Sequence, residues 1–426
     1  METLSLTVHR GSQEIGGTCI ELACEGTRLI LDCGLPLESI KVGESENIPK
    51  NTLMVPGLFA DGPKIAGILL SHAHADHSGL IPESNPSIPI FAGRATFKMA
   101  MTGSIFAGQP RIEQARERFM EPGKQIFIGT FQVTPYFVDH SVFGACAFLI
   151  EVAGKRLLYT GDLRFHGRKP GMRRQLMKDC AEGGVDVVIT EGTCLSRLTE
   201  SRTFSESDLE TTGAEVVALH QGLILVRFSP LNLDRFVSFL RIAKKSSREF
   251  VTDPYGAYVL MMARSEKVAL PDPFDSDCIR VLVPDGYWET KPGKAIAAHR
   301  KNMKARQIRI EEVLCKPNRF LMLWRPSMID SVFKGKWPSG ALCLYSMWKG
   351  YLEQDRERDL QKSFDQFEIK QQLLHASGHA SRPDLVAFLT ELNASQIIVV
   401  HSEEPELMRE TFPNVVDVTD GVPVTL

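Results

Sequence analysis

Three histidines and an aspartate fall within six residues of the chain, at His72, His74, Asp76 and His77. Imidazole nitrogens and carboxylate oxygens are donors that Zn²⁺ or Mn²⁺ accepts. The run follows the apolar residues 65–70, so it begins where a strand is expected to end. On an extended segment His72 and His74 point the same way, whereas Asp76 and His77 can turn toward a second ion. The spacing predicts a two-metal hydrolytic centre, such as one that cleaves a phosphodiester.

Further candidate ligands follow apolar runs elsewhere in the chain. They are His140 after residues 131–138, Asp162 after residues 157–160, and His401 after residues 397–400. Strand ends give the rigid support that a metal site needs. Each of these residues alone is equally well explained as an ordinary packed or solvated side chain. Together with the first run, they complete two coordination spheres.

The 426-residue chain has the composition of a soluble globular protein, with 43% hydrophobic and 24% charged residues. Its net charge is only −3. The molecule as a whole therefore gives no field that attracts nucleic acid, and a phosphate backbone would have to meet a local basic patch. Residues 291–309 are the most basic segment. They form either a solvated helix face or a strip that follows a nucleic-acid backbone.

The nine cysteines include no C-x-x-C pair. This spacing argues against a disulfide framework and a zinc ribbon, and it predicts a reducing compartment. The first residues lack the basic and then apolar order of a signal peptide. No stretch of about 18 apolar residues occurs. We therefore expect a cytoplasmic protein without a membrane partner.

The pattern of expected elements changes along the chain. Residues 1 to about 165 predict many short strands separated by Gly-containing turns. From about residue 200, helical patterns alternate with short apolar strands, which predicts a parallel α/β layer. Ser207 is the expected N-cap of a helix that runs to His220, with Glu210 completing a capping box. Further helices are expected from Leu233 and over residues 382–392.

These residues carry a family resemblance. The run His72-Ala-His-Ala-Asp-His77, with His140 and Asp162, resembles the motifs of the metallo-β-lactamase superfamily. The stretch Gly11-Ser-Gln-Glu-Ile-Gly-Gly17, followed by Leu31-Asp-Cys-Gly34, resembles the N-terminal signature of ribonuclease J.

Later motifs resemble the β-CASP branch of this superfamily, whose members cut nucleic acids. The matching segments are Thr190-Glu-Gly-Thr193, His375-Ala-Ser-Gly-His-Ala-Ser381, Val400-His-Ser-Glu403 and, as a strand-to-helix element of ribonuclease J, Arg227-Phe-Ser-Pro-Leu-Asn-Leu-Asp-Arg235. In this branch, a histidine at the place of His401 accompanies RNA substrates. The resemblance covers almost the whole chain.

The chain also departs from ribonuclease J. Ala75 stands where a glutamate is usual, and Ser402 stands where the third motif usually has glycine. The resemblance leads us to expect a protein that lacks the C-terminal domain of ribonuclease J and in which residues 194–370 are a compact form of the inserted domain. Exonuclease or endonuclease cutting, processivity and association into a homo-oligomer therefore stay open.

The resemblance implies an α/β fold, namely a metallo-β-lactamase αββα sandwich with an inserted parallel α/β β-CASP domain. Residues 1–193 and 371–426 are expected to form the sandwich, and residues 194–370 the inserted domain.

The resemblance also implies a ligand set for two divalent ions. His72, His74 and His140 would hold one ion, Asp76, His77 and His401 the other, and Asp162 would bridge them. Water activated by the ions is the expected nucleophile. Zn²⁺ suits a histidine-rich site, and Mn²⁺ suits a mixed carboxylate site.

Other matching positions are expected to orient ligands or bind substrate. Glu191 and Asp32 would orient ligands by accepting N–H bonds. His379 would donate a hydrogen bond or proton near the scissile phosphate, although it also fits an ordinary loop histidine. The expected substrate contacts are Ser377, Gly378, His375, Ser229, Asn232 and Arg235. For Asn232 plain helix capping, and for His375 a buried structural role, are equally open.

The function expected from these residues is metal-dependent hydrolysis of RNA, which is expected to be single-stranded. One alternative is a DNA or small-phosphodiester hydrolase of the same fold, against which His401 argues. Another is a non-catalytic RNA-binding subunit, but every expected ligand position is filled.

Overall fold

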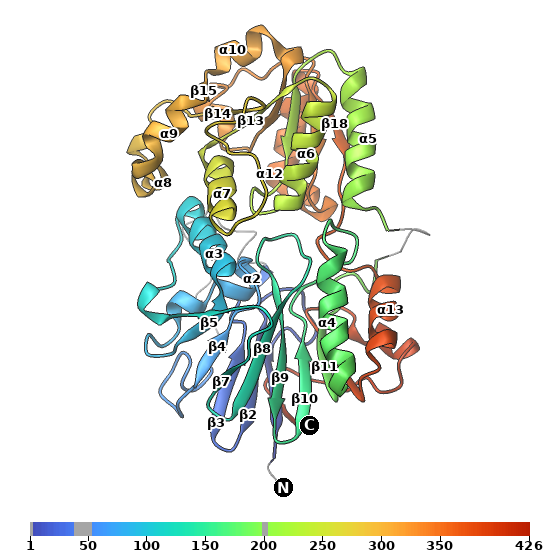
Figure 1. Cartoon of the computed structure of the whole chain (residues 1–426). Helices are drawn as coiled ribbons and strands as arrows, with labels where there is room; N and C mark the ends of the chain where they lie inside the picture. The colour runs from blue at the N-terminus through green and yellow to red at the C-terminus, as the bar shows by residue number, and fades with distance from the viewer. Residues whose placement is uncertain (1–2, 38–52, 198–202) are drawn as a thin grey trace. The chain divides into compact units, whose positions relative to one another are not determined.

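The computed structural model describes residues 3–37, 53–197 and 203–426, which form two compact units (Figure 1). Unit 1 comprises Met1–Gly103, Pro110–Thr203 and Gly378–Leu426, and unit 2 comprises Ser104–Gln109 and Phe204–Ser377. The sequence analysis placed the main boundaries at 193/194 and 370/371. The units divide at 203/204 and 377/378, where the packing changes. The three-part division itself stays a prediction.

Unit 1 contains two sheets. In the described residues, the first sheet has the strand order β20 (Pro423–Thr425), β1 (Ser5–Arg10), β2 (Cys19–Cys24), β3 (Thr27–Leu31), β4 (Gly67–Leu69), β5 (Ile90–Gly93) and β6 (Glu117–Met120). The second has the order β19 (Gln396–Val400), β11 (Val187–Glu191), β10 (Lys155–Tyr159), β9 (Cys146–Val152), β8 (Phe131–Phe137) and β7 (Ile126–Ile128). Most of these strands lie where apolar runs predicted them.

The two sheets of unit 1 pack face to face. Their inner side chains form one buried cluster that includes Leu6, Ile20 and Leu29 from the first sheet and Phe131, Phe148 and Leu157 from the second. Helices α4 (Pro170–Gly183) and α13 (Arg382–Leu392) cover the outer face of the second sheet (Figure 1). A separate cluster containing Leu80, Ile81 and Phe97 covers the outer face of the first. This is the expected αββα layering, which is confirmed.

Unit 2 is a parallel α/β layer, as the alternating pattern predicted. In its described residues the strand order is β15 (Gln307–Ile308), β14 (Ile279–Leu282), β13 (Glu249–Thr252), β16 (Phe320–Leu323), β12 (Ile224–Arg227), β17 (Leu342–Tyr345) and β18 (Lys370–Leu373). Every neighbouring pair runs parallel. Among the helices of the described chain, none combines the length and apolar character that crossing a bilayer requires.

One predicted helix cap is wrong. The helix α5 (Glu206–Leu219) begins two residues earlier than expected, and its N-cap is Ser205 with Asp208 as the capping-box partner. The pairs Ser205/Asp208 and Ser207/Glu210 both satisfy the local pattern. Burial of Glu206 and Leu209 at the helix start decides between them, and local sequence does not reveal it.

Candidate metal centre

The strands of the second sheet bring the distant candidate ligands to one edge of unit 1. β10, β11 and β19 run parallel and in register, so their carboxyl ends meet at the same edge. Glu191 closes β11, Asp162 follows β10, and His401 follows β19. β8 and β10 each pair antiparallel with β9, so β8 runs in the same direction as β10 and also ends at that edge. His140 comes three residues after its last residue, Phe137.

The run 72–77 reaches the same edge from the first sheet. The short helix α2 (Ala75–Ser78) starts after His74 and carries Asp76 and His77. Its backbone is tied to the end of β3, because the Cys33 N–H donates to the His77 carbonyl at 2.7 Å. Gly34 makes this contact feasible: a Cβ there would come 1.7 Å from the Asp76 carbonyl oxygen.

Gly34→Ala should therefore displace α2 and weaken metal binding. Overpacking of this kind costs about 1–3 kcal/mol, and the atom that must move belongs to backbone. We expect a lower melting temperature and less retained metal. Gly171→Ala in α4 is the matched control, since the nearest atom to its Cβ would be a guanidinium nitrogen of Arg174 at 3.6 Å. Equal metal content in the two purified variants would contradict the prediction.

The first donor group consists of His72, His74, His140 and Asp162. Their donor atoms all lie within 4.8 Å of one another. The Nδ1 of His74 lies 3.1 Å from the Nε2 of His140, and the Nε2 of His72 lies 3.6 Å from an Asp162 oxygen. Ligands of one tetrahedral Zn²⁺ stand about 3.3–3.6 Å apart, given metal–ligand lengths of about 2.0–2.2 Å. The group therefore fits one ion.

The second donor group consists of Asp76, His77 and His401, whose donor atoms also lie within 4.8 Å of one another. The Nε2 of His401 lies 3.3 Å from an Asp76 oxygen. The Nε2 of His77 lies 3.3 Å from the same Asp162 oxygen that faces the first group. One oxygen of Asp162 thus lies close to both groups, and its expected bridging of two ions stays a prediction.

Unsatisfied buried atoms support a cation at this place. The Nε2 atoms of His72 and His77 and both carboxylate oxygens of Asp162 are buried without a hydrogen-bond partner. Each such atom costs about 1–3 kcal/mol, and a divalent cation would satisfy all of them. Buried imidazoles with a shared carboxylate are a donor set suited to Zn²⁺ or Mn²⁺. The residues present fit divalent metal ions.

Two family models match the chain. One, described as a beta-lactamase superfamily domain, matches residues 27–226. The other, described as a Zn-dependent metallo-hydrolase RNA specificity domain, matches residues 368–410. The first range contains the run 72–77 with His140 and Asp162, and the second contains His401.

Residues 27–226 are therefore a domain of the beta-lactamase superfamily.

Known relatives agree with this assignment. The chain is 27% identical over 248 residues to ribonuclease J of Mycolicibacterium smegmatis, which is 54% of this chain and 41% of the relative. It is 28% identical over 199 residues to the RNase J-like protein of Methanocaldococcus jannaschii, which is 44% of this chain and 42% of the relative. The chain thus spans less than half the length of these curated relatives. The resemblance to ribonuclease J is confirmed.

A solved structure shares the fold. The crystal structure of a protein of unknown function from Enterococcus faecalis superposes with a TM-score of 0.77 at 21% identity, and the match covers 100% of both chains. This similarity extends the agreement in fold to the residues between the two family matches.

Asp32 is hydrogen-bonded to the segment that carries His72 and His77. It is fully buried and adopts a positive φ of 57°, a conformation that non-glycine residues keep only where the surroundings enforce it. One oxygen accepts from the Ser71 N–H at 2.7 Å, and the other from Nδ1 of His77 at 2.8 Å and the Tyr159 hydroxyl at 2.6 Å. Asp32 thereby fixes the ring of His77 with Nε2 facing Asp162.

Tyr159→Phe should loosen this support without touching a donor atom. Loss of the hydroxyl leaves a buried carboxylate oxygen short of one hydrogen bond, which costs about 1–3 kcal/mol. Partners of this type change metal affinity by about 10- to 100-fold. Titration of the metal-stripped protein with Zn²⁺ measures the effect. Tyr345→Phe, which removes an equally buried hydroxyl bonded to the Trp348 carbonyl at 3.3 Å, should leave Zn²⁺ affinity unchanged.

Several orienting groups escaped the sequence analysis. The Thr193 hydroxyl lies 2.9 Å from Nδ1 of His401, and the Gly378 carbonyl accepts from Nδ1 of His140 at 2.7 Å. Each contact leaves the Nε2 of its histidine for the donor groups. Thr193 and Gly378 lie inside the recognised motifs, so the motif was the available signal. For Gly378, the residue type gives no signal, because the acceptor is its backbone carbonyl.

His379 and Glu191 form a pair at the rim of the centre. Glu191 accepts from Nδ1 of His379 at 2.8 Å and from the Leu163 N–H at 2.8 Å. The side chain of His379 keeps 21% of its surface exposed, whereas that of Glu191 keeps 2%. His379 is therefore held by a buried carboxylate and stays accessible to a ligand. Glu191 accepts N–H bonds as expected, and its role stays a prediction.

Burial sets the charge state of the cluster. It lowers the pKa of His72 and His140 well below the ordinary range and that of His74 to about 4. The neutral ring is the form that binds a metal. Burial also works against protonation of His77, but the carboxylates of Asp162 and Asp32 raise its pKa well above the usual value. A bound cation would take the place of that proton.

In unit 2, two of the expected substrate contacts, Arg235 and Asn232, have other partners in the structure. Arg235 as a substrate contact is wrong, because it is fully buried and its guanidinium is held by Glu206 at 3.1 Å and by the Ala376 carbonyl at 2.7 Å. Asn232 caps α6 (Leu233–Lys245) by accepting from the Arg235 N–H at 3.0 Å, so the capping alternative holds.

The remaining substrate positions stay predictions. Ser229 is exposed and Ser377 is half-buried. His375 is half-buried, with Nδ1 3.3 Å from a guanidinium nitrogen of Arg235. In unit 1, Gly378 is half-buried, and a Cβ there would come 2.8 Å from the Ser141 hydroxyl. Its side-chain-free position is thus required by local packing.

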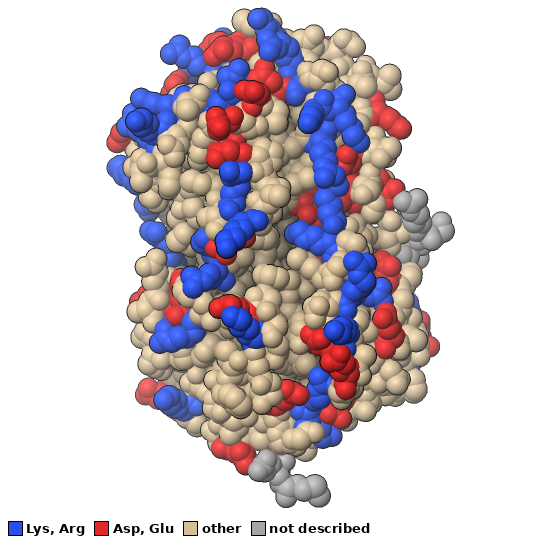
Figure 2. Space-filling view, in the orientation of Figure 1, with Lys and Arg blue, Asp and Glu red and all other residues tan. Residues whose placement is uncertain are grey.

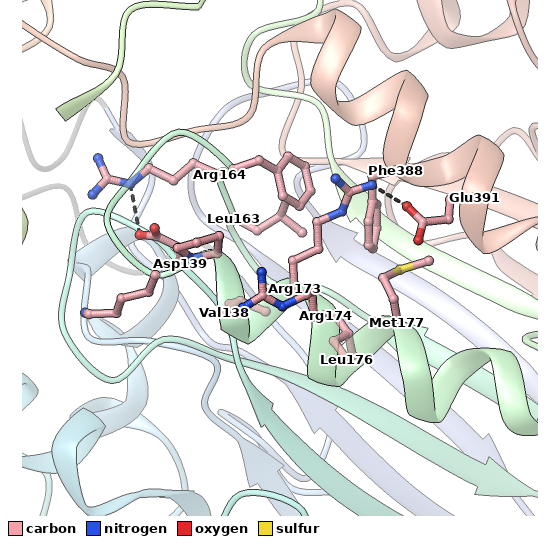
Figure 3. Close-up of a pocket in the computed structure, with 13 residues that line it drawn as sticks. Val138, Asp139, Leu163, Arg164, Arg173, Arg174, Leu176, Met177, Phe388 and Glu391 are labelled. Carbon is pink, nitrogen blue, oxygen red and sulfur yellow. Dashed lines mark hydrogen bonds and ion pairs between the residues drawn. The ribbon is translucent and has the colours of Figure 1, made fainter. Parts of the chain in front are cut away.

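A cavity of about 280 Å³ lies beside the donor groups, between the ends of β8 and β10 and helices α4 and α13 (Figure 3). Its charged groups are largely paired: Asp139 with Arg164 at 3.1 Å and Arg173 with Glu391 at 2.5 Å. Asp139 precedes His140, and Arg164 follows Asp162 by two residues. Their buried ion pair therefore ties together the two loops that carry these donors.

Proposed function

We propose that the chain is a metal-dependent ribonuclease that hydrolyses phosphodiester bonds of single-stranded RNA in the cytoplasm. The observation that carries the proposal is the set of buried, unsatisfied donor atoms of His72, His77 and Asp162, in a chain that also matches an RNA specificity domain. The absence of a C-x-x-C pair among the nine cysteines of the sequence is in keeping with the compartment. The similarity to a ribonuclease J and to an RNase J-like protein supports the choice of RNA.

We assign the residues as follows. His72, His74 and His140 would hold one ion, Asp76, His77 and His401 a second, and Asp162 would contact both. When bound, two such ions supply a lowered pKa for water and stabilise charge on phosphoryl oxygens. Zn²⁺ is the proposed metal, because imidazoles dominate the donor set.

The chain's own groups have separate tasks in this reaction. Asp32, Thr193 and the Gly378 carbonyl hold the imidazole rings so that one nitrogen faces the donor groups. His379, whose Nδ1 is held by Glu191 and whose side chain is 21% exposed, would donate a hydrogen bond to a phosphate oxygen. The buried surroundings of the donors exclude bulk water and strengthen these interactions.

Digestion of one 5′-labelled and one 3′-labelled RNA tests the proposal. The metal-stripped protein is supplied with Zn²⁺ or Mn²⁺, and DNA of the same sequence is digested in parallel. Metal-dependent shortening of RNA is expected, and product lengths from the two labels give direction and mode. No RNA cleavage with either metal, or faster cleavage of the DNA, would overturn the proposal.

A further inference from the structure

The most basic segment of the chain, residues 291–309 (the basic segment), is strongly segregated in charge. It carries seven cations, namely Lys291, Lys294, Arg300, Lys301, Lys304, Arg306 and Arg309, and no Asp or Glu occurs between residues 290 and 310. The whole chain has a net charge of −3. The remaining residues therefore carry −10 (−3 − 7 = −10, His neutral in both). The basic segment is thus positively charged within a protein whose net charge is negative, and its local positive potential attracts an anionic partner.

The basic segment is anchored in unit 2 by buried apolar side chains. It connects β14 to the edge strand β15 through α8 (Lys291–Ala295), η4 (Ala297–His299) and α9 (Arg300–Ala305). Ile296, Met303 and Ile308 are buried and anchor one side. The lysines lie on the exposed side. In Figure 2, Lys and Arg side chains gather over α8 and α9.

The exposed lysines of the basic segment are not neutralised by the described part of the protein. Among the described residues, no carboxylate pairs with Lys291, Lys294, Lys301 or Lys304. An ion pair of the segment joins the Arg306 side chain to Asp277 at 3.7 Å. A plain solvated helix of the same unit looks different. In α12 (Asp355–Gln366), Arg358 pairs with Asp355 at 3.1 Å and Lys362 with Asp359 at 2.8 Å. The solvated-face alternative therefore leaves the missing acidic residues unexplained.

An aromatic side chain accompanies the cations. The Arg300 guanidinium lies 5.5 Å from the ring centre of Trp288, which is half-buried and contacts Tyr287 edge-on at 5.2 Å. Cations that follow a backbone, combined with an aromatic ring on which a base can stack, are the combination used to bind single-stranded nucleic acid without sequence preference.

We infer that the basic segment binds the phosphate backbone of single-stranded RNA and holds the substrate chain independently of its sequence. The inference deepens the proposed function and rests on it for the choice of RNA. Each phosphate neutralised on a single strand contributes about −0.7 to the slope of log affinity against log salt. Four lysines would contribute about −2.8 to this slope, so the contribution of the basic segment to RNA binding can be measured.

Salt-dependent binding of a fluorescein-labelled, unstructured phosphorothioate RNA tests the inference by anisotropy. The variant K291Q/K294Q/K301Q/K304Q is compared with K334Q/R319Q/R358Q/K362Q, which loses the same charge from unit 2 at cations paired with carboxylates. We expect the first variant to lose about 3 from the salt slope and at least 10-fold in affinity at 0.1 M salt, and the second to stay close to the parent.

The outcomes separate the inference from the proposed function. Equal slopes in the two variants would overturn the inference, whether or not the parent protein cleaves RNA. Equally tight binding of poly-glutamate to the segment would also overturn it, because the partner would then be any polyanion. Loss of RNA binding in the first variant, with a parent that cleaves no RNA, would support the inference and overturn only the nuclease. Circular dichroism confirms that both variants fold.

Discussion

Asp162→Asn should remove the tightly bound metal and slow RNA cleavage by about a thousandfold or more. Asp162 is 2% exposed, and both its oxygens lack hydrogen-bond partners. One of them lies 3.3 Å from His77 and 3.6 Å from His72, so a single side chain serves both donor groups. An amide supplies neither the negative charge nor the second acceptor oxygen. A thousandfold loss corresponds to about 4 kcal/mol, which is in the range of charge stabilisation by a metal.

Asp253→Asn provides the comparison. Asp253 is equally buried, at 2% exposure, but it caps α7 (Pro254–Ser265) in unit 2 and pairs with Arg325. Asp253→Asn protein should keep its metal and its initial cleavage rate, whereas Asp162→Asn protein should lose both. Mass spectrometry measures the metal content, and initial rates measure the cleavage. A full complement of metal in purified Asp162→Asn protein would show that the two donor groups do not share this carboxylate.

His379→Gln should lower the cleavage rate by about 10²- to 10⁴-fold while metal content stays unchanged. The side chain is 21% exposed, and its Nδ1 is held by the buried Glu191. A histidine that acts on the substrate as a proton or hydrogen-bond donor contributes on this scale. Single-turnover rates with saturating protein separate this effect from weaker RNA binding.

A second histidine–carboxylate pair of the same unit gives a matched control. His9 contacts Glu21 at 2.9 Å and is 16% exposed. His9→Gln should therefore leave cleavage close to the parent rate. If Glu191 acts through His379, the double variant Glu191→Gln/His379→Gln should be no slower than His379→Gln alone. Additive losses, or loss of metal from His379→Gln protein, would contradict this arrangement.

Much of the fold followed from local patterns in the sequence. The apolar run 397–400 became the buried strand β19, and the alternation of helices and short apolar runs after residue 200 became a parallel sheet. Central strands of a layered fold are apolar for most of their length, so their sequence signal is strong. Exact helix starts were weaker, because two neighbouring serines each satisfied the capping pattern at α5.

The case of Arg235 shows a second limit. From the sequence, an arginine in the first turn of a helix after Asn232 resembles an anion site. In the structure its partner is Glu206, which lies 29 positions away in the chain. A buried arginine requires an acidic partner, but no local pattern says which of the 52 acidic residues provides it. Only the packing of unit 2 removes Arg235 from the substrate contacts.

For the proposed metal centre, the sequence alone was enough to predict the donor set. Residue type, the six-residue spacing at 72–77 and the position of His140, Asp162 and His401 after apolar runs were sufficient to name it. The tertiary structure decided which nitrogen of each ring faces the centre. That choice depends on hydrogen bonds from distant segments, such as Asp32 to His77 and Thr193 to His401. A histidine offers two equivalent donors in sequence, and only a folded neighbour occupies one of them.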